Sequence, residues 1–166
     1  MKRLTALTLL CALYIAAFAD GVRVAFTPSP GAVSLTGSTI VTDSKERAVI
    51  NTVAGLLRDD YMLVTGKELN ISDRTVKGNL IVIGTPASSH IRKLVKKGLI
   101  DLAPIENGYE QYMITVIKNA FSRNGDAIVI VGSDARGAAY GALSLSERMG
   151  VSPWYWWADV PVTRHD

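Results

Sequence analysis

Apolar residues recur at helical spacing in the first half of the chain. The stretch that predicts a helix begins near Asp43, ends at Gly66 and carries its apolar side chains at Val49, Ile50, Val53, Leu56, Leu57 and Val64. Residues three, four and seven positions apart share one face of an α-helix, so this pattern predicts an amphipathic helix. Asp43 with Glu46 three residues later resembles a capping box, and Gly66 is typical of a helix end.

Two further stretches predict helices. One follows the turn at residues 84–86 (GTP) and has an apolar face of Ile91, Leu94 and Val95. The other begins at Asp134, whose carboxylate is suited to cap a helix, and runs to about Met149, with Gly150 as its stop.

Short apolar runs between the helices predict strands at residues 38–42 (STIVT), 79–83 (NLIVI), 109–118 (YEQYMITVIK) and 127–131 (AIVIV). A polar turn at residues 122–125 (SRNG) separates the last two runs, which are expected to pair antiparallel. Strands and helices alternate along the chain. The pattern therefore predicts an α/β (α+β) fold: an open mixed β-sheet with helices packed on it.

The N-terminal residues predict export. Lys2 and Arg3 precede an almost wholly apolar run at residues 4–19, which ends in Ala-Phe-Ala. A basic start, an apolar run and a small-x-small end are typical of a signal peptide at residues 1–19, cleaved before Asp20. The alternative, a membrane anchor, needs about 20 apolar residues. We expect a secreted or periplasmic protein that is not held in a membrane after cleavage.

Cleavage changes the charge and the cysteine content. The chain has 18 Lys+Arg against 15 Asp+Glu, so losing Lys2 and Arg3 leaves 16 against 15, a net charge of +1. No basic patch of the kind that binds nucleic acid remains, because Arg92, Lys93, Lys96 and Lys97 fit the solvated face of a helix. The single cysteine, Cys11, lies in the leader. We therefore expect no disulfide and no nucleic-acid partner.

Other polar residues give weak signals for chemistry. His90 and His165 are far apart in sequence and no cysteine accompanies them in the mature chain, so no metal site is expected. Asp59 and Asp60 are neighbours on a helix and do not face each other, so they are interpreted as a solvated face. The turns at 84–86 and 132–137 match no phosphate-binding motif. No cofactor is implied.

The last predicted helix has side chains of three kinds on three stripes. One stripe comprises Arg136, Tyr140, Leu143 and Glu147; a second is small, Gly137, Gly141 and Ser144; the third is apolar, Ala138, Ala142, Leu145 and Met149. A helix that is small or apolar nearly all round is usually buried on more than one side. A second packing surface besides the sheet is expected, one that this chain does not necessarily contain. Arg136 suits a carboxylate of substrate or an inter-domain contact, with the contact favoured.

An aromatic run follows that helix directly. Residues 151–161 read VSPWYWWADVP, so Trp154, Tyr155, Trp156 and Trp157 are consecutive and Asp159 follows them. Tryptophan and tyrosine bury large areas while offering a polar group. Two interpretations stay open: a hydrophobic joint with a neighbouring domain, which composition favours, and a platform on which sugar rings stack.

The residues from Ile128 to Pro161 closely resemble the end of the N-terminal domain of glycoside hydrolase family 115. The resemblance is carried by Gly-Ser-Asp-x-Arg-Gly at 132–137, the Tyr140-Gly141 helix and the tail at 150–161, and more loosely by most of the mature chain. It implies an accessory domain at residues 20–161, and at 162–166 the start of a linker to a (β/α)8 catalytic barrel. Members are similar to inverting enzymes that remove α-1,2-linked (4-O-methyl)glucuronic acid from xylan or glucuronoxylan.

The resemblance places the catalytic carboxylates in the barrel, so no residue of this chain is expected to be catalytic. The residues expected to contact either substrate or the barrel are Arg136, Tyr140, Glu147, Trp154, Trp156, Trp157 and Asp159. The alternative function is a free-standing secreted module that binds carbohydrate or is structural, without hydrolase activity.

Overall fold

A computed structural model describes residues 23–27, 32–122 and 125–165, so the predicted signal peptide lies outside the described residues. Five strands form one sheet: β1 (Thr39–Val41), β2 (Asn70–Ser72), β3 (Leu80–Gly84), β4 (Tyr112–Ser122) and β5 (Gly125–Gly132). The helices are α1 (Ala48–Thr65), α2 (Ser89–Lys96), α3 (Ala135–Met149) and the single turn α4 (Tyr155–Ala158).

The sheet is mixed, as predicted. Its strand order is β2-β1-β3-β5-β4, in which the first four strands run parallel and β4 runs antiparallel to β5. The predicted hairpin between the last two strands is confirmed by pairs such as Ile114 with Ile130 and Val116 with Ile128. The chain is therefore an α/β fold with a five-stranded mixed sheet.

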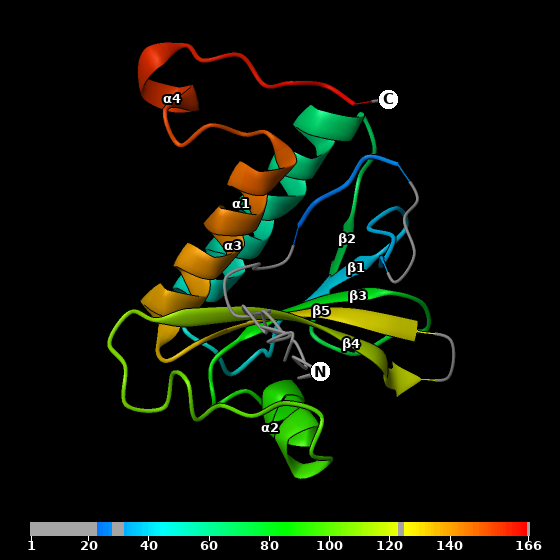
Figure 1. The fold of residues 1–166 in the computed structure, drawn as a ribbon, viewed down its shortest axis with the longest axis vertical. Helices are drawn as coiled ribbons and strands as arrows, with labels where there is room; N and C mark the ends of the chain where they lie inside the picture. Colours follow the sequence, from blue (N-terminus) through cyan, green and yellow to red (C-terminus); the bar gives the residue numbers. More distant parts are fainter. Residues whose placement is uncertain (1–22, 28–31, 123–124, 166) are drawn as a thin grey trace, which may run out of the picture.

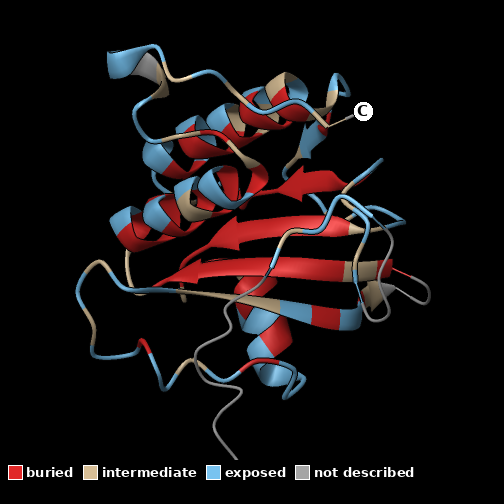
Figure 2. Cartoon of the chain, turned by 45° about the horizontal axis from the view of Figure 1, so that its top comes forward, coloured by how far each residue is buried: buried red, intermediate tan, exposed pale blue. Residues whose placement is uncertain are grey.

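Helices cover both faces of the sheet. α1 and α3 lie side by side on one face and α2 lies on the other (Figure 1). Along β3, Ile81 and Ile83 belong to the core under α1 and α3, whereas Leu80 and Val82 belong to the core under α2. Successive strand residues point to opposite faces. Because both faces are covered, the central strands are buried throughout, which explains their continuous apolar sequence (Figure 2).

α1 has the predicted apolar face and C-terminal end, but not the predicted N-terminal cap. Ile50, Val53 and Leu57 are buried, and Gly66 ends the helix in the left-handed conformation at φ 67°. The helix begins only at Ala48, after Arg47, whose side chain makes no capping bond. The capping-box prediction is wrong because the Asp43 carboxylate is bonded instead to the N-terminus of α2.

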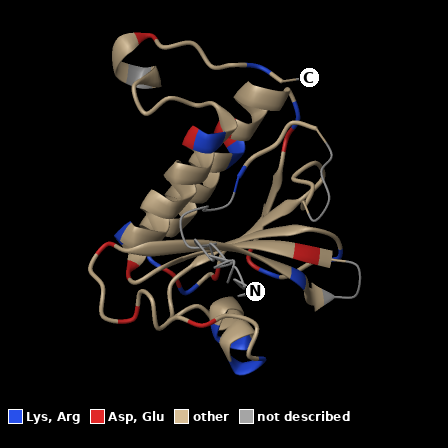
Figure 3. Cartoon of the chain, in the orientation of Figure 1, with Lys and Arg blue, Asp and Glu red and all other residues tan. Residues whose placement is uncertain are grey.

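α2 has two of the three residues predicted for its apolar face buried. The hydroxyl of Ser88 accepts the backbone N–H of His90 at 3.2 Å, which caps the helix, and Ile91 and Leu94 are fully buried. Val95 was expected on this face but is 41% exposed, because α2 rests on the sheet by a single narrow stripe. Its Lys and Arg residues lie on the solvent side, as expected (Figure 3).

α3 packs against two surfaces, and both are in this chain. Its small stripe meets the sheet: a Cβ added at Gly141 would lie 2.6 Å from Ile130 Cγ2 and 3.1 Å from the Tyr112 ring. Its apolar stripe, with Ala142 and Leu145, shares one core with the buried face of α1. The second packing surface that the helix pattern required is therefore α1, and no other part of the protein is needed to cover this stripe.

Two elements differ from the predicted strands. β2 was not predicted, because its three residues are largely exposed and form no apolar run. β4 begins at Tyr112, three residues later than predicted, because Tyr109 and Glu110 form a turn in which Glu110 has a φ of 55°. That left-handed backbone redirects the chain before the strand starts.

Asp59 and Asp60 have different surroundings. Asp59 is exposed and its carboxylate pairs with Arg58 at 2.7 Å, as a solvated face predicts. Asp60 is only 9% exposed, so the prediction is wrong for this residue, which turns toward α3. Burial raises the pKa of Asp60, because the ionised carboxylate loses solvation. The charge of Asp59 raises this pKa further, whereas the nearby Ser146 hydroxyl lowers it. The Asp60 and Ser146 side chains do not meet the geometry of a hydrogen bond.

Candidate functional site

Four side chains gather at the N-terminal end of α3, and we call them the Arg136 cluster: Tyr109, Glu110, Arg136 and Tyr140. One guanidinium nitrogen of Arg136 lies 2.6 Å from Glu110 Oε1. The guanidinium also donates to the hydroxyls of Tyr140 at 3.3 Å and Tyr109 at 3.5 Å. Arg136 and Tyr140 were predicted site residues, and the ion-pair partner of Arg136 is Glu110.

Asp134 holds the cluster in place. Its Oδ1 accepts the backbone N–H groups of Arg136 at 2.9 Å and Gly137 at 2.8 Å, which caps α3 as predicted. Its Oδ2 accepts the N–H of Glu110 at 2.9 Å and so ties the preceding turn to the same helix end. The backbone N–H groups of Gly137 and Glu110 lower the pKa of Asp134, since they stabilise the ionised carboxylate.

The cluster is open to solvent. Tyr109 is 76% exposed, Tyr140 is 41% exposed and the side chain of Arg136 is 62% exposed, whereas that of Glu110 is 22% exposed. Hydrogen bonding to Tyr140 and the charge of Glu110 raise the pKa of Arg136. The carboxylates of Glu110 and Asp134 are both engaged by donors. The cluster therefore leaves two tyrosine rings and the Arg136 guanidinium open to solvent.

The aromatic run forms a second exposed surface, at α4. Trp154 is 65% exposed and Trp157 is 85% exposed. Tyr155 between them is half-buried against the main core and anchors the turn. Asp159 follows α4 in the left-handed conformation and is exposed. The side chain of Trp156 lies outside the described residues. We call Trp154, Trp157 and Asp159 the tryptophan surface.

The two surfaces lie toward opposite ends of α3 (Figure 1). Tyr140 and Met149 are nine residues apart, a distance of about 14 Å along a helix that rises 1.5 Å per residue. Glu147, also a predicted site residue, is exposed on the last turn of α3, near the end from which α4 follows. The structure therefore divides the predicted residues between two surfaces instead of joining them in one site.

Sequence reasoning missed Tyr109 and Glu110. They were assigned to the start of a strand, where a glutamate and a tyrosine carry no signal of chemistry. Their role depends on the approach of residues 109–110 to a helix 26 positions later in the chain, and only the folded structure supplies that approach.

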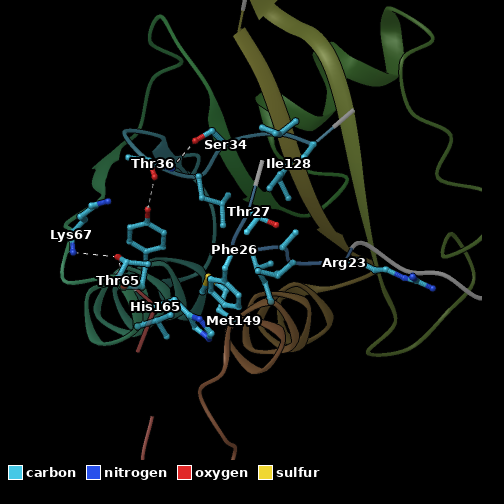
Figure 4. Close-up of a pocket in the computed structure, with 18 of the residues that line it drawn as sticks. Arg23, Phe26, Thr27, Ser34, Thr36, Thr65, Lys67, Ile128, Met149 and His165 are labelled. Carbon is cyan, nitrogen blue, oxygen red and sulfur yellow. Dashed lines mark hydrogen bonds between the residues drawn. The ribbon is translucent and has the colours of Figure 1, made fainter. Parts of the chain in front are cut away.

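A cavity of about 700 Å³ is lined by residues 23–27 and 32–36 together with residues of α1, α3 and the sheet (Figure 4). No residue of the two surfaces contributes to this lining. Its wall is mostly apolar and includes Val64, Ile128, Leu145 and Met149. At its rim the rings of Phe26 and His165 are stacked with centroids 3.4 Å apart. Backbone N–H of His165 also donates to the carbonyl of Val64 at 2.8 Å, so residues 162–165 return to the end of α1.

The two histidines have different surroundings. His90 is buried and its Nε2 lies 3.0 Å from the carbonyl oxygen of Asp73, whereas His165 stacks on Phe26. In the described ranges there is no group of three or more His, Cys, Asp or Glu side chains placed to hold a metal ion. Nor does any described helix have the length and apolarity to cross a membrane.

Comparison with known proteins gives a relationship at the level of structure. No family model and no curated protein matches the chain. Among solved structures, the chain is similar to BtGH115A, a family GH115 4-O-methyl-α-glucuronidase with specificity for decorated arabinogalactans. The TM-score is 0.62 and the sequence identity 30%, over 78% of this chain and 16% of that chain. CpGH84D aligns with a TM-score of 0.48 and 16% identity, over 68% of this chain and 17% of that chain.

The chain thus spans about a sixth of the length of BtGH115A. Over the aligned residues the two chains are 30% identical and superpose with a TM-score of 0.62, and this chain has a mixed sheet with helices packed on it. From this likeness, the chain has a GH115-like α/β fold and is a glycoside hydrolase-related domain.

Proposed function

We propose that this chain is the N-terminal accessory domain of a secreted glycoside hydrolase that removes (4-O-methyl)glucuronic acid from a plant polysaccharide. The proposal rests on the structural similarity of this chain to a GH115 4-O-methyl-α-glucuronidase, with 30% sequence identity over the aligned residues. Chemistry is assigned to a barrel outside these residues, and this chain contributes contact surfaces. The predicted signal peptide supports export, since plant polysaccharides are extracellular.

The two exposed surfaces support a docking role. A stable protein interface usually has large aromatic side chains and arginine at its centre. The tryptophan surface has two indoles of which more than half is exposed, and Tyr155 fixes their position by its contact with the core. The Arg136 cluster adds two tyrosine rings around a fixed guanidinium. We assign both surfaces to contact with the barrel.

Xylan or glucuronoxylan is the substrate that we expect for the whole protein. The similar enzyme, in contrast, has specificity for decorated arabinogalactans. Both polysaccharides carry (4-O-methyl)glucuronic acid, so the group removed is the same and the backbone differs. We therefore propose (4-O-methyl)glucuronic acid as the group removed, and the experiment below distinguishes a xylan backbone from an arabinogalactan backbone.

The test compares this chain with the longer product of the same reading frame. Each is incubated with aldouronic acids from xylan and with glucuronic acid-decorated arabinogalactan, and released uronic acid is measured. We expect release only by the longer product. Release by the chain alone would place catalysis within it and overturn the proposal, as would a longer product without a glycosidase barrel.

The second candidate function is a free-standing carbohydrate-binding module, which the exposure of Trp154 and Trp157 favours. Indole rings stack on the C–H faces of sugars, so binding should quench or shift tryptophan fluorescence. Titration calorimetry with xylan oligosaccharides separates the two functions. Binding by the isolated chain that disappears in Trp157→Ala supports the module, whereas no heat and no fluorescence change supports docking.

A further inference from the structure

The carboxyl ends of β1 and β3 form the switch point of the sheet. These strands are parallel neighbours. After β1 the chain passes to α1 on one face, and after β3 it passes to α2 on the other face (Figure 1). Open α/β sheets bind ligands in the crevice where two such connections diverge. The backbone N–H groups at the start of the following helix usually receive the negative charge of the ligand.

In this chain two carboxylates occupy those donors. Oδ2 of Asp43, from the loop after β1, accepts the backbone N–H of Ser89 at 2.7 Å, at the first residue of α2. Oε1 of Glu46 accepts both the backbone N–H and the hydroxyl of Thr85, at 2.7 and 2.8 Å. The donors that a bound anion would use are thus satisfied from within the chain.

The crevice is also full. Asp43 is 6% exposed, and Thr85 and Ser88 beside it are buried. A Cβ added at Gly84 would lie 3.0 Å from Ser88 Cβ and 3.2 Å from Glu46 Oε1, which is tighter than ordinary van der Waals contact. Ser88 or Glu46 would have to move to admit even a methyl group there, and a phosphate group is larger than a methyl group.

We infer that Asp43 and Glu46 act as an internal substitute for a ligand: they close the crevice at the switch point and clamp the loop before α1 to the start of α2. The two contacts join residues that are 46 and 39 positions apart, so they fix the position of one helix layer relative to the other. This clamp is independent of the proposed glycosidase role, since neither carboxylate lies on the two docking surfaces.

The groups around Asp43 stabilise its carboxylate in the ionised form. The groups that face Asp43 are the hydroxyl and N–H of Ser89, the N–H of Lys45 and the ring of His90. Hydrogen bonding to Ser89 and Lys45 holds the pKa of Asp43 far below its ordinary value, which means that the folded chain stabilises the ionised form.

The test is chemical rescue of Asp43→Ala in the full chain. Removing the side chain leaves a cavity of carboxylate shape beside unpaired N–H groups, which formate can fill. At neutral pH we expect the melting temperature of the variant to fall by about 4 °C or more. Sodium formate should restore about half of that loss or more, compared with sodium chloride at equal ionic strength. Asp59→Ala, which removes an exposed carboxylate, is the matched control, and neither it nor wild type should respond specifically to formate.

Two results overturn the inference: a melting temperature of Asp43→Ala that equals that of wild type, or recovery in formate no greater than in chloride. Should Asp43→Ala fail to fold, Glu46→Ala, which removes the acceptor of both Thr85 hydrogen bonds, provides a second test. The amide of Thr85 should then exchange its hydrogen about tenfold faster than in wild type, while Gly66 at the end of α1 is unchanged. Equal exchange at Thr85 in variant and wild type contradicts the clamp.

Discussion

The backbone of Gly137 in α3 lies directly against the carbonyl oxygen of Gln111, so that no Cβ fits between them. The N–H of Ser133 donates to the same carbonyl at 2.8 Å. Gln111 comes just before β4 and Gly137 is in the first turn of α3, so this contact sets the distance between the helix and the edge of the sheet. The small stripe of α3 is therefore a requirement of packing.

Gly137→Ala should destabilise the chain by about 2 kcal/mol or more, because the overlap outweighs the gain of about 1 kcal/mol in helix propensity. Gly55→Ala in α1 is the matched control. A Cβ at Gly55 meets nothing within 4 Å, so this variant should be more stable by up to about 1 kcal/mol. Urea unfolding measures both. A stabilised Gly137→Ala would show that the close contact is not present.

Asp134→Ala should lower the free energy of unfolding by about 1–2 kcal/mol near neutral pH, since it removes the cap of α3. The pKa of Asp134 is depressed in the folded chain. Its contribution is therefore complete above the unfolded pKa of about 3.9 and is lost as the pH falls toward the folded value. Unfolding measured across this acid range should show the difference between variant and wild type shrinking. A difference that stays constant would contradict the assigned titration.

Asp60→Asn should stabilise the chain near neutral pH, because it removes a charge from a buried position without changing shape. The pKa of Asp60 is raised in the folded chain, so its protonated form favours folding. That contribution is present below the unfolded pKa of about 3.9 and is lost as the pH rises through the folded value. The gain in the free energy of unfolding from Asp60→Asn should thus be absent below pH about 3.9 and should develop as the pH rises toward the raised folded pKa. Asp59→Asn, at an exposed site, should show no such pH-dependent gain.

Trp154→Ala and Trp157→Ala should each change the free energy of unfolding by less than about 0.5 kcal/mol, since both side chains are mostly exposed. Tyr155→Ala should cost about 1–2 kcal/mol, because this half-buried ring packs on the core. If the tryptophan surface awaits a partner domain, wild type should bind hydrophobic dye and the double tryptophan variant should bind less. Equal dye binding would contradict the docking role of this surface.

How far the fold could be predicted depended on how local each signal was. The buried strand at Leu80–Gly84 and the end of α1 at Gly66 were predicted because continuous apolar residues and a left-handed glycine are local signals. The strand Asn70–Ser72 was not, because it is short and exposed and owes its conformation to pairing with β1.

The candidate site was predicted only in part, for the same reason. Arg136 and Tyr140 share a helix face by their spacing alone, and Trp154 and Trp157 are conspicuous by composition. The partner of Arg136, in contrast, is Glu110, on a turn that sequence analysis assigned to a strand. The separation of the two surfaces along α3 also required the position of α4 in space.

The sequence by itself determined α1, α2 and α3, most strands, the aromatic run and a resemblance to glycoside hydrolase family 115, because each depends on residues close together in the chain. Only the tertiary structure decided that α1 covers the second side of α3 and that Asp43 accepts the N–H of Ser89 at the start of α2 instead of capping α1. A carboxylate can satisfy any N–H within reach, and which N–H is within reach depends on how distant segments pack.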